Sequence, residues 1–276
     1  MKYRVFLIAL SLCTTVLLSS CNDIHISQST LDQMNMNTMQ KNVMPTKSNW
    51  KTSADLKPNK NIPILIFIKD KGNKPITRFD TVHEKLMHLI IVSKDLSYFS
   101  HIHPVYMGNG EFDIKTKFPA GGDYQLIAEF TPHGAGDNSV EKHWLNINGP
   151  APRPVPIIPD TNLTKTIDGL NITLSFDHIM AMMGLNMTFT ICDAATNKPI
   201  TNLQPYLGAM GHAVAISKDL QEYLHIHPMT TKGNGPKVTF MTYFPKDGVY
   251  KIWGQFQYNG HVIVAPFVVN VPKMKM

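Results

Sequence analysis

Cysteine is scarce in this chain of 276 residues, which contains only Cys13, Cys21 and Cys192. The first two lie in or beside an apolar N-terminal segment, so Cys192 alone remains for the folded part. A single cysteine cannot form an internal disulfide. The packing of apolar side chains must therefore hold the fold together.

Long apolar runs, helical periodicity and clusters of positive charge are also missing. The N-terminal apolar stretch, Val5–Leu18, is shorter than the ~20 residues that a transmembrane helix needs. No segment shows the sustained spacing of an amphipathic helix. The formal net charge is +6 at pH 7, but the lysines are scattered along the chain. We therefore expect no nucleic-acid partner.

The N-terminus has the layout of a secretory signal, with basic residues before the apolar stretch. Leu18-Ser-Ser-Cys21 resembles the lipobox of bacterial lipoproteins. That resemblance implies a signal peptide at residues 1–20 and a lipid anchor, with palmitate, on Cys21. The anchor would hold the protein on a lipid bilayer of the bacterial cell envelope, facing the periplasm. Asn22 after the cysteine favours the outer membrane, and a bare transmembrane helix is the alternative.

Residues 21–47 are rich in Asn, Gln, Ser, Thr and Met and have no periodic apolar pattern. This composition predicts a flexible tether between the lipid and the first domain. The tether holds Met34, Met36 and Met39, whose spacing is typical of soft metal ligands.

One stretch of sequence occurs twice. His88–Pro104 returns as His212–Pro228 with every position offset by 124, and the FPAGGDYQLIAEF and FPKDGVYKIWGQF segments match at an offset of 126. A repeat this long is too large for a solenoid unit and suits two similar small domains. We place these modules at residues 48–149 and 161–276, joined by a proline-rich linker at 150–160.

The apolar runs inside each module are short, rich in Ile, Val, Phe and Tyr, and separated by turn clusters. This pattern predicts an all-β fold with two tandem, homologous β-sandwich modules of the immunoglobulin-like or cupredoxin-like kind. The Gly-x-Tyr segments at Gly122–Tyr124 and Gly248–Tyr250 look like the tyrosine corners of such sandwiches.

The first repeated segment reads as a β-hairpin that turns at Ser93–Leu96. A two-residue or four-residue loop there places His88 directly opposite His101. His103 then lies on the same face, diagonal to His88, because side chains alternate along a strand. Three imidazoles converge on one side of the hairpin, which is the arrangement that one metal ion needs.

The same construction in the second module places His212 opposite His225, and Met210 across from His227. Leu86 occupies the position of Met210 in the first module. Imidazole suits copper, zinc and nickel, and a thioether shifts the preference toward copper. With 16 methionines in the chain, we expect copper as the cofactor, with zinc as the alternative.

The second module resembles a module found in secreted or lipid-anchored bacterial proteins of unassigned function. The GH…LHxHP…FPxxGxY pattern that carries the resemblance spans residues 165–271. The first module departs from it at Met87, which replaces the glycine, and lacks the LQPYLG run. The resemblance implies an extracytoplasmic β-sandwich and hints at metal handling, without an established reaction.

Three functions compete. The leading hypothesis is a periplasmic, membrane-anchored, metal-binding lipoprotein that buffers or passes on copper and is not an enzyme. The alternative is an envelope protein–protein interaction module whose histidines are structural. The third is a zinc enzyme with three-histidine sites. The remaining histidines do not recur in register and are expected on the surface or in the tether: His25, His83, His133, His143, His178 and His261.

Overall fold

The computed structural model describes residues 43–229 and 232–274. The predicted signal peptide, the lipidation site at Cys21 and most of the tether, with Met34, Met36 and Met39, lie outside the described residues. Among the described residues, no helix is long and apolar enough to cross a membrane.

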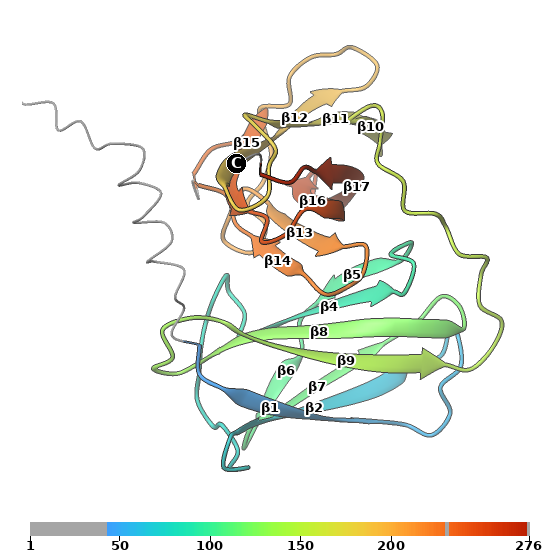
Figure 1. The fold of residues 1–276 in the computed structure, drawn as a ribbon, viewed down its shortest axis with the longest axis vertical. Coiled ribbons are helices and arrows are strands. Elements are labelled where there is room, and N and C mark those ends of the chain that lie inside the picture. Colours follow the sequence, from blue (N-terminus) through green and yellow to red (C-terminus); the bar gives the residue numbers. More distant parts are fainter. Residues whose placement is uncertain (1–42, 230–231, 275–276) are drawn as a thin grey trace, which may run out of the picture. The chain divides into compact units, whose positions relative to one another are not determined.

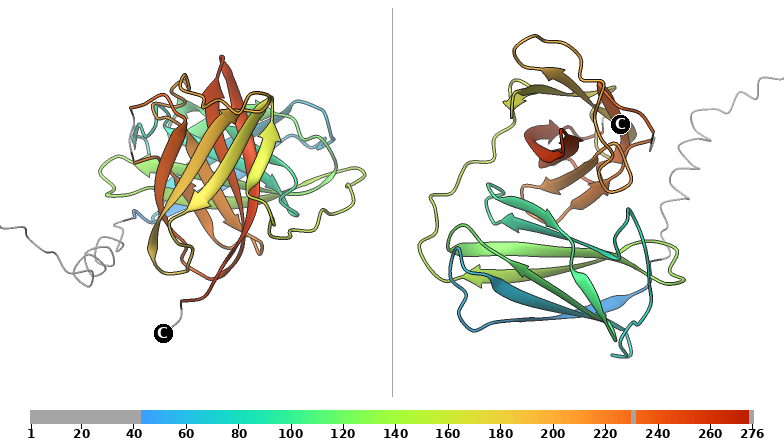
Figure 2. Two further views of the ribbon diagram at one scale, coloured as in Figure 1. Left: turned by 90° about the horizontal axis from the view of Figure 1, so that it is seen from above. Right: turned by 180° about the vertical axis from the view of Figure 1, so that it is seen from behind.

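The first module consists of two antiparallel sheets (Figure 1, Figure 2). One sheet has the order β1-β2-β7-β6, and the other has the order β3-β8-β4-β5 with β9 paired to β8. The strands are β1 (Thr46–Thr52), β2 (Ile62–Asp70), β3 (Phe79–Asp80), β4 (Met87–Ser93), β5 (Phe99–Ile102), β6 (Val105–Gly108), β7 (Glu111–Thr116), β8 (Gly122–Pro132) and β9 (Ser139–Ile147).

The second module repeats this plan, with one sheet ordered β10-β11-β12-β15 and the other β14-β13-β16-β17. Its strands are β10 (Thr164–Ile167), β11 (Leu170–Phe176), β12 (Gly184–Asp193), β13 (His212–Ser217), β14 (Tyr223–Ile226), β15 (Lys237–Tyr243), β16 (Gly248–Tyr258) and β17 (His261–Val271). The predicted all-β fold with two tandem sandwich modules is confirmed.

Both predicted tyrosine corners are present. The Tyr124 hydroxyl donates to the carbonyl of Ala120, and the Tyr250 hydroxyl donates to the carbonyl of Lys246, each at 3.0 Å. A buried tyrosine needs a partner for its hydroxyl. Closure of the loop four residues upstream supplies that partner and fixes the start of the long strand, which supports the immunoglobulin-like description.

The strands that carry the histidines are buried on both faces. In β4, Leu89 and Ile91 belong to the core of their own module, whereas Ile90 and Val92 pack into a separate apolar cluster. In β13, Ala213 and Ala215 face their own core in the same way. Alternation along a strand thus sends one face of the hairpin inward and the other toward the second module. This explains why both faces of these strands are apolar in the sequence.

We call the shared apolar cluster the inter-module cluster. Its buried members are four residues of the first module and their four equivalents in the second: Ile90, Val92, Leu96 and Ile127, with Val214, Ile216, Leu220 and Trp253. Phe99 stacks on Trp253 with ring centroids 4.7 Å apart. Because the same positions of both modules meet, the contact has the character of an isologous, two-fold interface within one chain.

We predict that Ile90→Ala destabilises the protein by about 2–5 kcal/mol, because Ile90 is fully buried in the inter-module cluster and the change leaves a cavity. Urea unfolding measures the change. Val105→Ala on the exposed edge of β6, where the side chain is 64% exposed, is the control and should shift stability by less than about 0.5 kcal/mol. Equal effects of the two substitutions would contradict the packing described here.

Candidate metal centre

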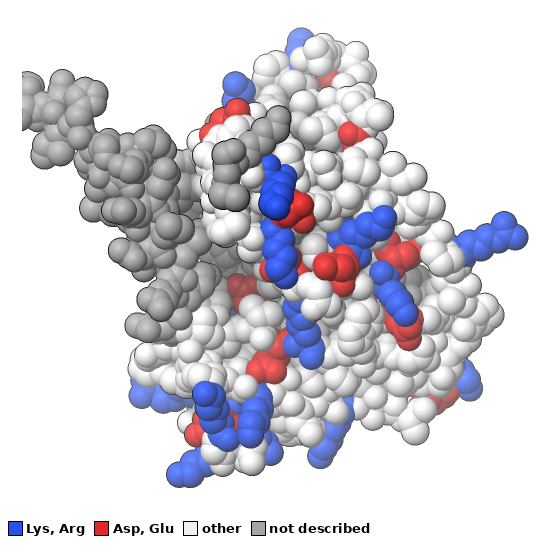
Figure 3. Space-filling view, viewed as in Figure 1, with Lys and Arg blue, Asp and Glu red and all other residues white. Residues whose placement is uncertain are grey.

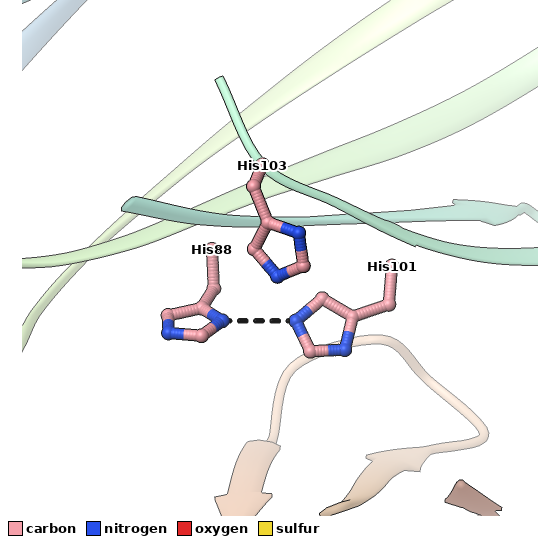
Figure 4. A group of neighbouring side chains, drawn as sticks. All are labelled: His88, His101 and His103. Carbon is pink, nitrogen blue, oxygen red and sulfur yellow. Dashed lines mark hydrogen bonds between the residues drawn. The ribbon is translucent and has the colours of Figure 1, made fainter. Parts of the chain in front are cut away.

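The first three-histidine group, hereafter the first triad, consists of His88, His101 and His103, from β4, β5 and the segment after β5 (Figure 4). One ring nitrogen from each lies within 4.8 Å of the others. Nδ1 of His88 is 3.0 Å from Nε2 of His101. The three rings therefore converge on one side of the hairpin, as the alternation of side chains predicts.

The predicted register of this hairpin is wrong by two residues. β4 pairs with β5 as Ile90 with His101, so the extension of the register places His103, not His101, opposite His88. The loop begins one residue later than expected because the Asp95 carboxylate accepts hydrogen bonds from Ser93 and Ser97. A shift by two residues keeps every side chain on its face, and the triad survives the error.

The second triad consists of His212, His225 and His227, again with one nitrogen from each within 4.8 Å of the others. The pairing of Ala213 with Ile226 extends to place His212 opposite His227. The prediction that Met210 lies opposite His227 rests on the wrong register. β13 begins only at His212, and the Met210 side chain is buried in the core of the second module.

The two triads lie against each other. Ring centroids of His88 and His225 are 5.1 Å apart, and those of His101 and His225 are 5.4 Å apart. The ring centroids of His101 and His212 are 6.1 Å apart. The six imidazoles thus form one histidine cluster, placed beside the inter-module cluster on the same faces of β4 and β13.

Each module orients the central histidine of the other. Nδ1–H of His225 donates to the Glu129 carboxylate on β8 at 2.9 Å, and Nδ1–H of His101 donates to Oε1 of Gln255 on β16 at 3.1 Å. Glu129 and Gln255 are equivalent positions at the offset of 126. Such hydrogen bonds fix the tautomer, so that Nε2 of each ring is a lone-pair donor that faces its triad.

The first histidine of each triad is oriented by a backbone carbonyl. Nε2–H of His88 donates to the carbonyl of Val82 at 3.0 Å, and Nε2–H of His212 donates to the carbonyl of Tyr206 at 3.1 Å. A carbonyl can only accept. Nδ1 of both rings therefore carries a lone pair that points into the triad.

The second triad leaves three inward nitrogens without partners among the described residues: His212 Nδ1, His225 Nε2 and His227 Nε2. In the first triad, His103 Nε2 is equally unpartnered. The inward nitrogens of His88 and His101 face each other with their hydrogens directed outward. Buried polar atoms without partners are costly. A cation at the centre of each triad would satisfy them.

Burial keeps the cluster neutral. Desolvation, followed by the positive charge that the neighbouring histidines would carry, holds the pKa of His225 and of His101 well below the ordinary value of 6.5. Burial also lowers the pKa of His212 to about 4, of His103 to about 3 and of His227 to about 2. Neutral imidazole is the form that binds metal ions.

The nitrogens are nearly close enough for coordination. Metal–imidazole bonds of about 2.0–2.1 Å need nitrogens within about 4 Å of one another, and small ring rotations cover the difference. A small cavity of about 10 Å³ borders His88, Glu129, His225 and His227. It has room for about one water molecule.

Sequence reasoning missed two contributors. His83 stacks on His227 with centroids 3.7 Å apart and an interplanar angle of 18°, although its equivalent is Leu207 and it does not recur. Glu129 was also missed, although a carboxylate inside the apolar run QLIAEF is a usable signal. Both act on the other module's triad, which a search for ligands within one repeat does not reveal.

The remaining histidines of the described chain have other surroundings. His133 contacts the carboxylate of Asp80, and His178 contacts that of Asp177. His143 stacks on Trp50, and His261 is exposed at the start of β17.

The charged side chains on the face shown in Figure 3 are of both signs, and the two signs are interspersed.

A family model matches both modules, at residues 42–149 and 165–273. The chain belongs to the family described as a domain of unknown function (DUF8832). The match to two tandem copies agrees with the repeat and with the resemblance to proteins of unassigned function. A comparison with curated proteins finds no match.

Among solved structures, the chain is similar to the adhesin InvE of Yersinia pseudotuberculosis, at 9% identity and a TM-score of 0.27, with 83% of this chain and 61% of that one covered. It is also similar to the bacterial integrin-binding protein invasin, at 13% identity and a TM-score of 0.24, with 82% and 39% covered. The chain therefore spans about three fifths and two fifths of their lengths. Identities and scores this low carry no functional information.

The neutral burial of the cluster predicts how stability depends on pH. The folded-state pKa of His101 and of His225 lies below the unfolded value of 6.5, so the unfolded chain binds protons that the folded chain does not. The contribution is fully present above pH 6.5 and is lost as the pH falls. Between pH 6.5 and its lower folded-state pKa, each such histidine decreases the unfolding free energy by up to about 1.4 kcal/mol for each unit that the pH falls.

Urea unfolding of the metal-free protein at pH 7.5, 6.5 and 5.5 measures this slope, with a chelator present throughout. His225→Gln removes one of the titrating groups and should give a shallower slope below pH 6.5. Equal stability at pH 6.5 and 5.5 would show that these histidines are not buried in the neutral form.

Proposed function

We propose that this protein is a metal-binding lipoprotein of the bacterial envelope that holds copper at its two triads and buffers the ion or passes it on. One observation carries the proposal: the inward nitrogens of His212, His225 and His227 converge, are buried, and have no partner in the described chain. The outer nitrogen of His212 donates to the carbonyl of Tyr206, and that of His225 donates to the Glu129 carboxylate. Ligand atoms that face inward with their rings fixed from behind are the usual construction of a metal site.

The choice of metal rests on imidazole alone, because Met210 lies in the core. Imidazole suits copper, zinc and nickel, and copper(II) stands above zinc in affinity for a given set of nitrogen ligands. Charge favours the monovalent ion further. Two divalent ions would place four positive charges in a cluster to which, in the described part of the chain, a single carboxylate, Glu129, is hydrogen-bonded. Two copper(I) ions would halve that charge and lower the cost of burial.

The site of action follows from the N-terminus. A lipid on Cys21 would anchor the chain to the envelope, and the tether would give the modules reach from the bilayer. Methionines in the tether are soft ligands that suit copper(I) and could exchange it with the triads. These assignments rest on the sequence pattern.

We predict that the full chain, incubated with copper(I) and desalted, retains two equivalents of copper per chain. Replacing His212, His225 and His227 together with alanine should remove one equivalent, and replacing all six triad histidines should remove both, because each triad supplies every protein ligand of its ion. Elemental analysis measures the metal content. His261→Ala, an exposed histidine outside the cluster, is the control and should leave the content unchanged.

The same measurement, repeated after incubation with zinc, separates the competing functions. Failure of the unaltered chain to retain copper or zinc would contradict the proposal and favour the interaction module with structural histidines. Retention of zinc but not copper would make a three-histidine zinc site the better description, and hydrolysis or hydration assays would then follow.

A further inference from the structure

We infer that the two triads are unequal, and that the second triad binds the first ion and holds it more tightly. The inference rests on the proposed function and goes beyond it, because it assigns an order of filling. Its basis is the near symmetry of the cluster, in which the hydrogen bonds behind the first and central histidines of one triad have equivalents in the other. Three differences between the triads favour the second one.

The first difference lies behind the central histidines. His225 donates to a carboxylate, Glu129, whereas His101 donates to an amide, Gln255. A carboxylate partner raises the basicity of a metal-bound imidazole more than an amide does, and loss of such a partner typically lowers metal affinity by about 10–100-fold. The carboxylate also offsets the charge of the ion that enters beside it.

The second difference is that further hydrogen bonds hold the Glu129 carboxylate, whereas the Gln255 side-chain amide nitrogen has no partner among the described residues. Glu129 accepts additional hydrogen bonds from the Tyr223 hydroxyl at 2.7 Å and from Nδ2 of Asn138 at 2.6 Å. The equivalent of Tyr223 is Phe99, which has no hydroxyl, and Nε2 of Gln255 has no partner in the described chain. A fixed acceptor prepares the His225 ring for its ligand role before the ion arrives.

The third difference is His83. Its ring stacks on His227 and lies edge-on to His212 at 5.1 Å. It sits in the tight turn between Val82 and Lys85, and the equivalent turn of the second module carries Leu207. The first module therefore adds a further imidazole beside the second triad. The second module has only the aliphatic side chain of Leu207 at the equivalent position.

These differences predict a tight site and an exchangeable site in one protein. At low copper, the second triad would fill alone. The first triad would fill later, next to an ion already present, and like charges separated by a few ångströms lower the affinity for the second ion. The ion in the first triad is then the one available for transfer.

The test uses two reciprocal substitutions in the full chain, with copper(I) as the probe and competition against a chromophoric copper(I) chelator as the readout. The unaltered chain should bind two equivalents with affinities at least tenfold apart. Glu129→Gln should weaken the tighter site by about 10–100-fold and bring the two affinities together. Gln255→Glu should strengthen the weaker site instead. Glu111→Gln, on β7 of the first module, removes a carboxylate elsewhere and should change neither affinity.

Identity of the tight site is tested by deleting one triad at a time. Replacing His88, His101 and His103 with alanine should leave the tighter equivalent, and replacing His212, His225 and His227 should leave the weaker one. Thermal unfolding of each metal-free variant checks that it is folded. If Glu129→Gln does not fold, Gln255→Glu still decides, because it adds the carboxylate to the other side.

The outcomes separate the inference from the function on which it rests. Two equivalents of equal affinity, or a tighter site in the first triad, would overturn the inference and leave the proposed function standing. Binding of no copper by the unaltered chain would overturn both.

Discussion

The structure depends on one constraint: six imidazoles, two of them buried and four half-buried, lie together, and they must stay neutral and be oriented from outside the cluster. Burial holds the pKa of each triad histidine below its ordinary value. Glu129 and Gln255 fix the central rings, and the carbonyls of Val82 and Tyr206 fix the first rings. Because the N–H groups of these four rings point outward, the other nitrogen of each ring carries a lone pair that points inward. The proposed cations would satisfy these lone pairs, which are otherwise costly to bury.

Duplication supplied the means to bury such a cluster. A single hairpin exposes its histidines on one face, and a second copy of the same hairpin covers them. The apolar half of that face becomes the inter-module cluster, with Phe99 stacked on Trp253, and the polar half becomes the histidine cluster. Because each module provides the outer hydrogen-bond partner for the other's central histidine, the proposed metal binding would be coupled to association of the modules. Divergence at Glu129, Tyr223 and His83 is the basis of the unequal affinities that we infer for the two triads.

Much of this was predictable from the repeat alone. Alternation along a strand was enough to place the histidines of each module on one face, and Gly-x-Tyr was enough to find both tyrosine corners. The register was wrong because Asp95 closes the loop through side-chain hydrogen bonds that loop length does not reveal. Met210 was misplaced because β13 starts only at His212. The meeting of the triads, and the roles of Glu129 and His83, depend on long-range packing between modules, which no local pattern encodes.

X-ray absorption at the copper edge of the fully loaded protein tests the central claim most directly, because it reports the atoms bound to the metal. The account predicts a shell of imidazole nitrogens at about 2.0 Å, with the outer-ring scattering of histidine and without sulfur, for both ions. A shell dominated by sulfur would place the copper on methionines instead. A shell of oxygens without imidazole scattering would mean that the buried histidines do not hold the metal, and the account would be wrong.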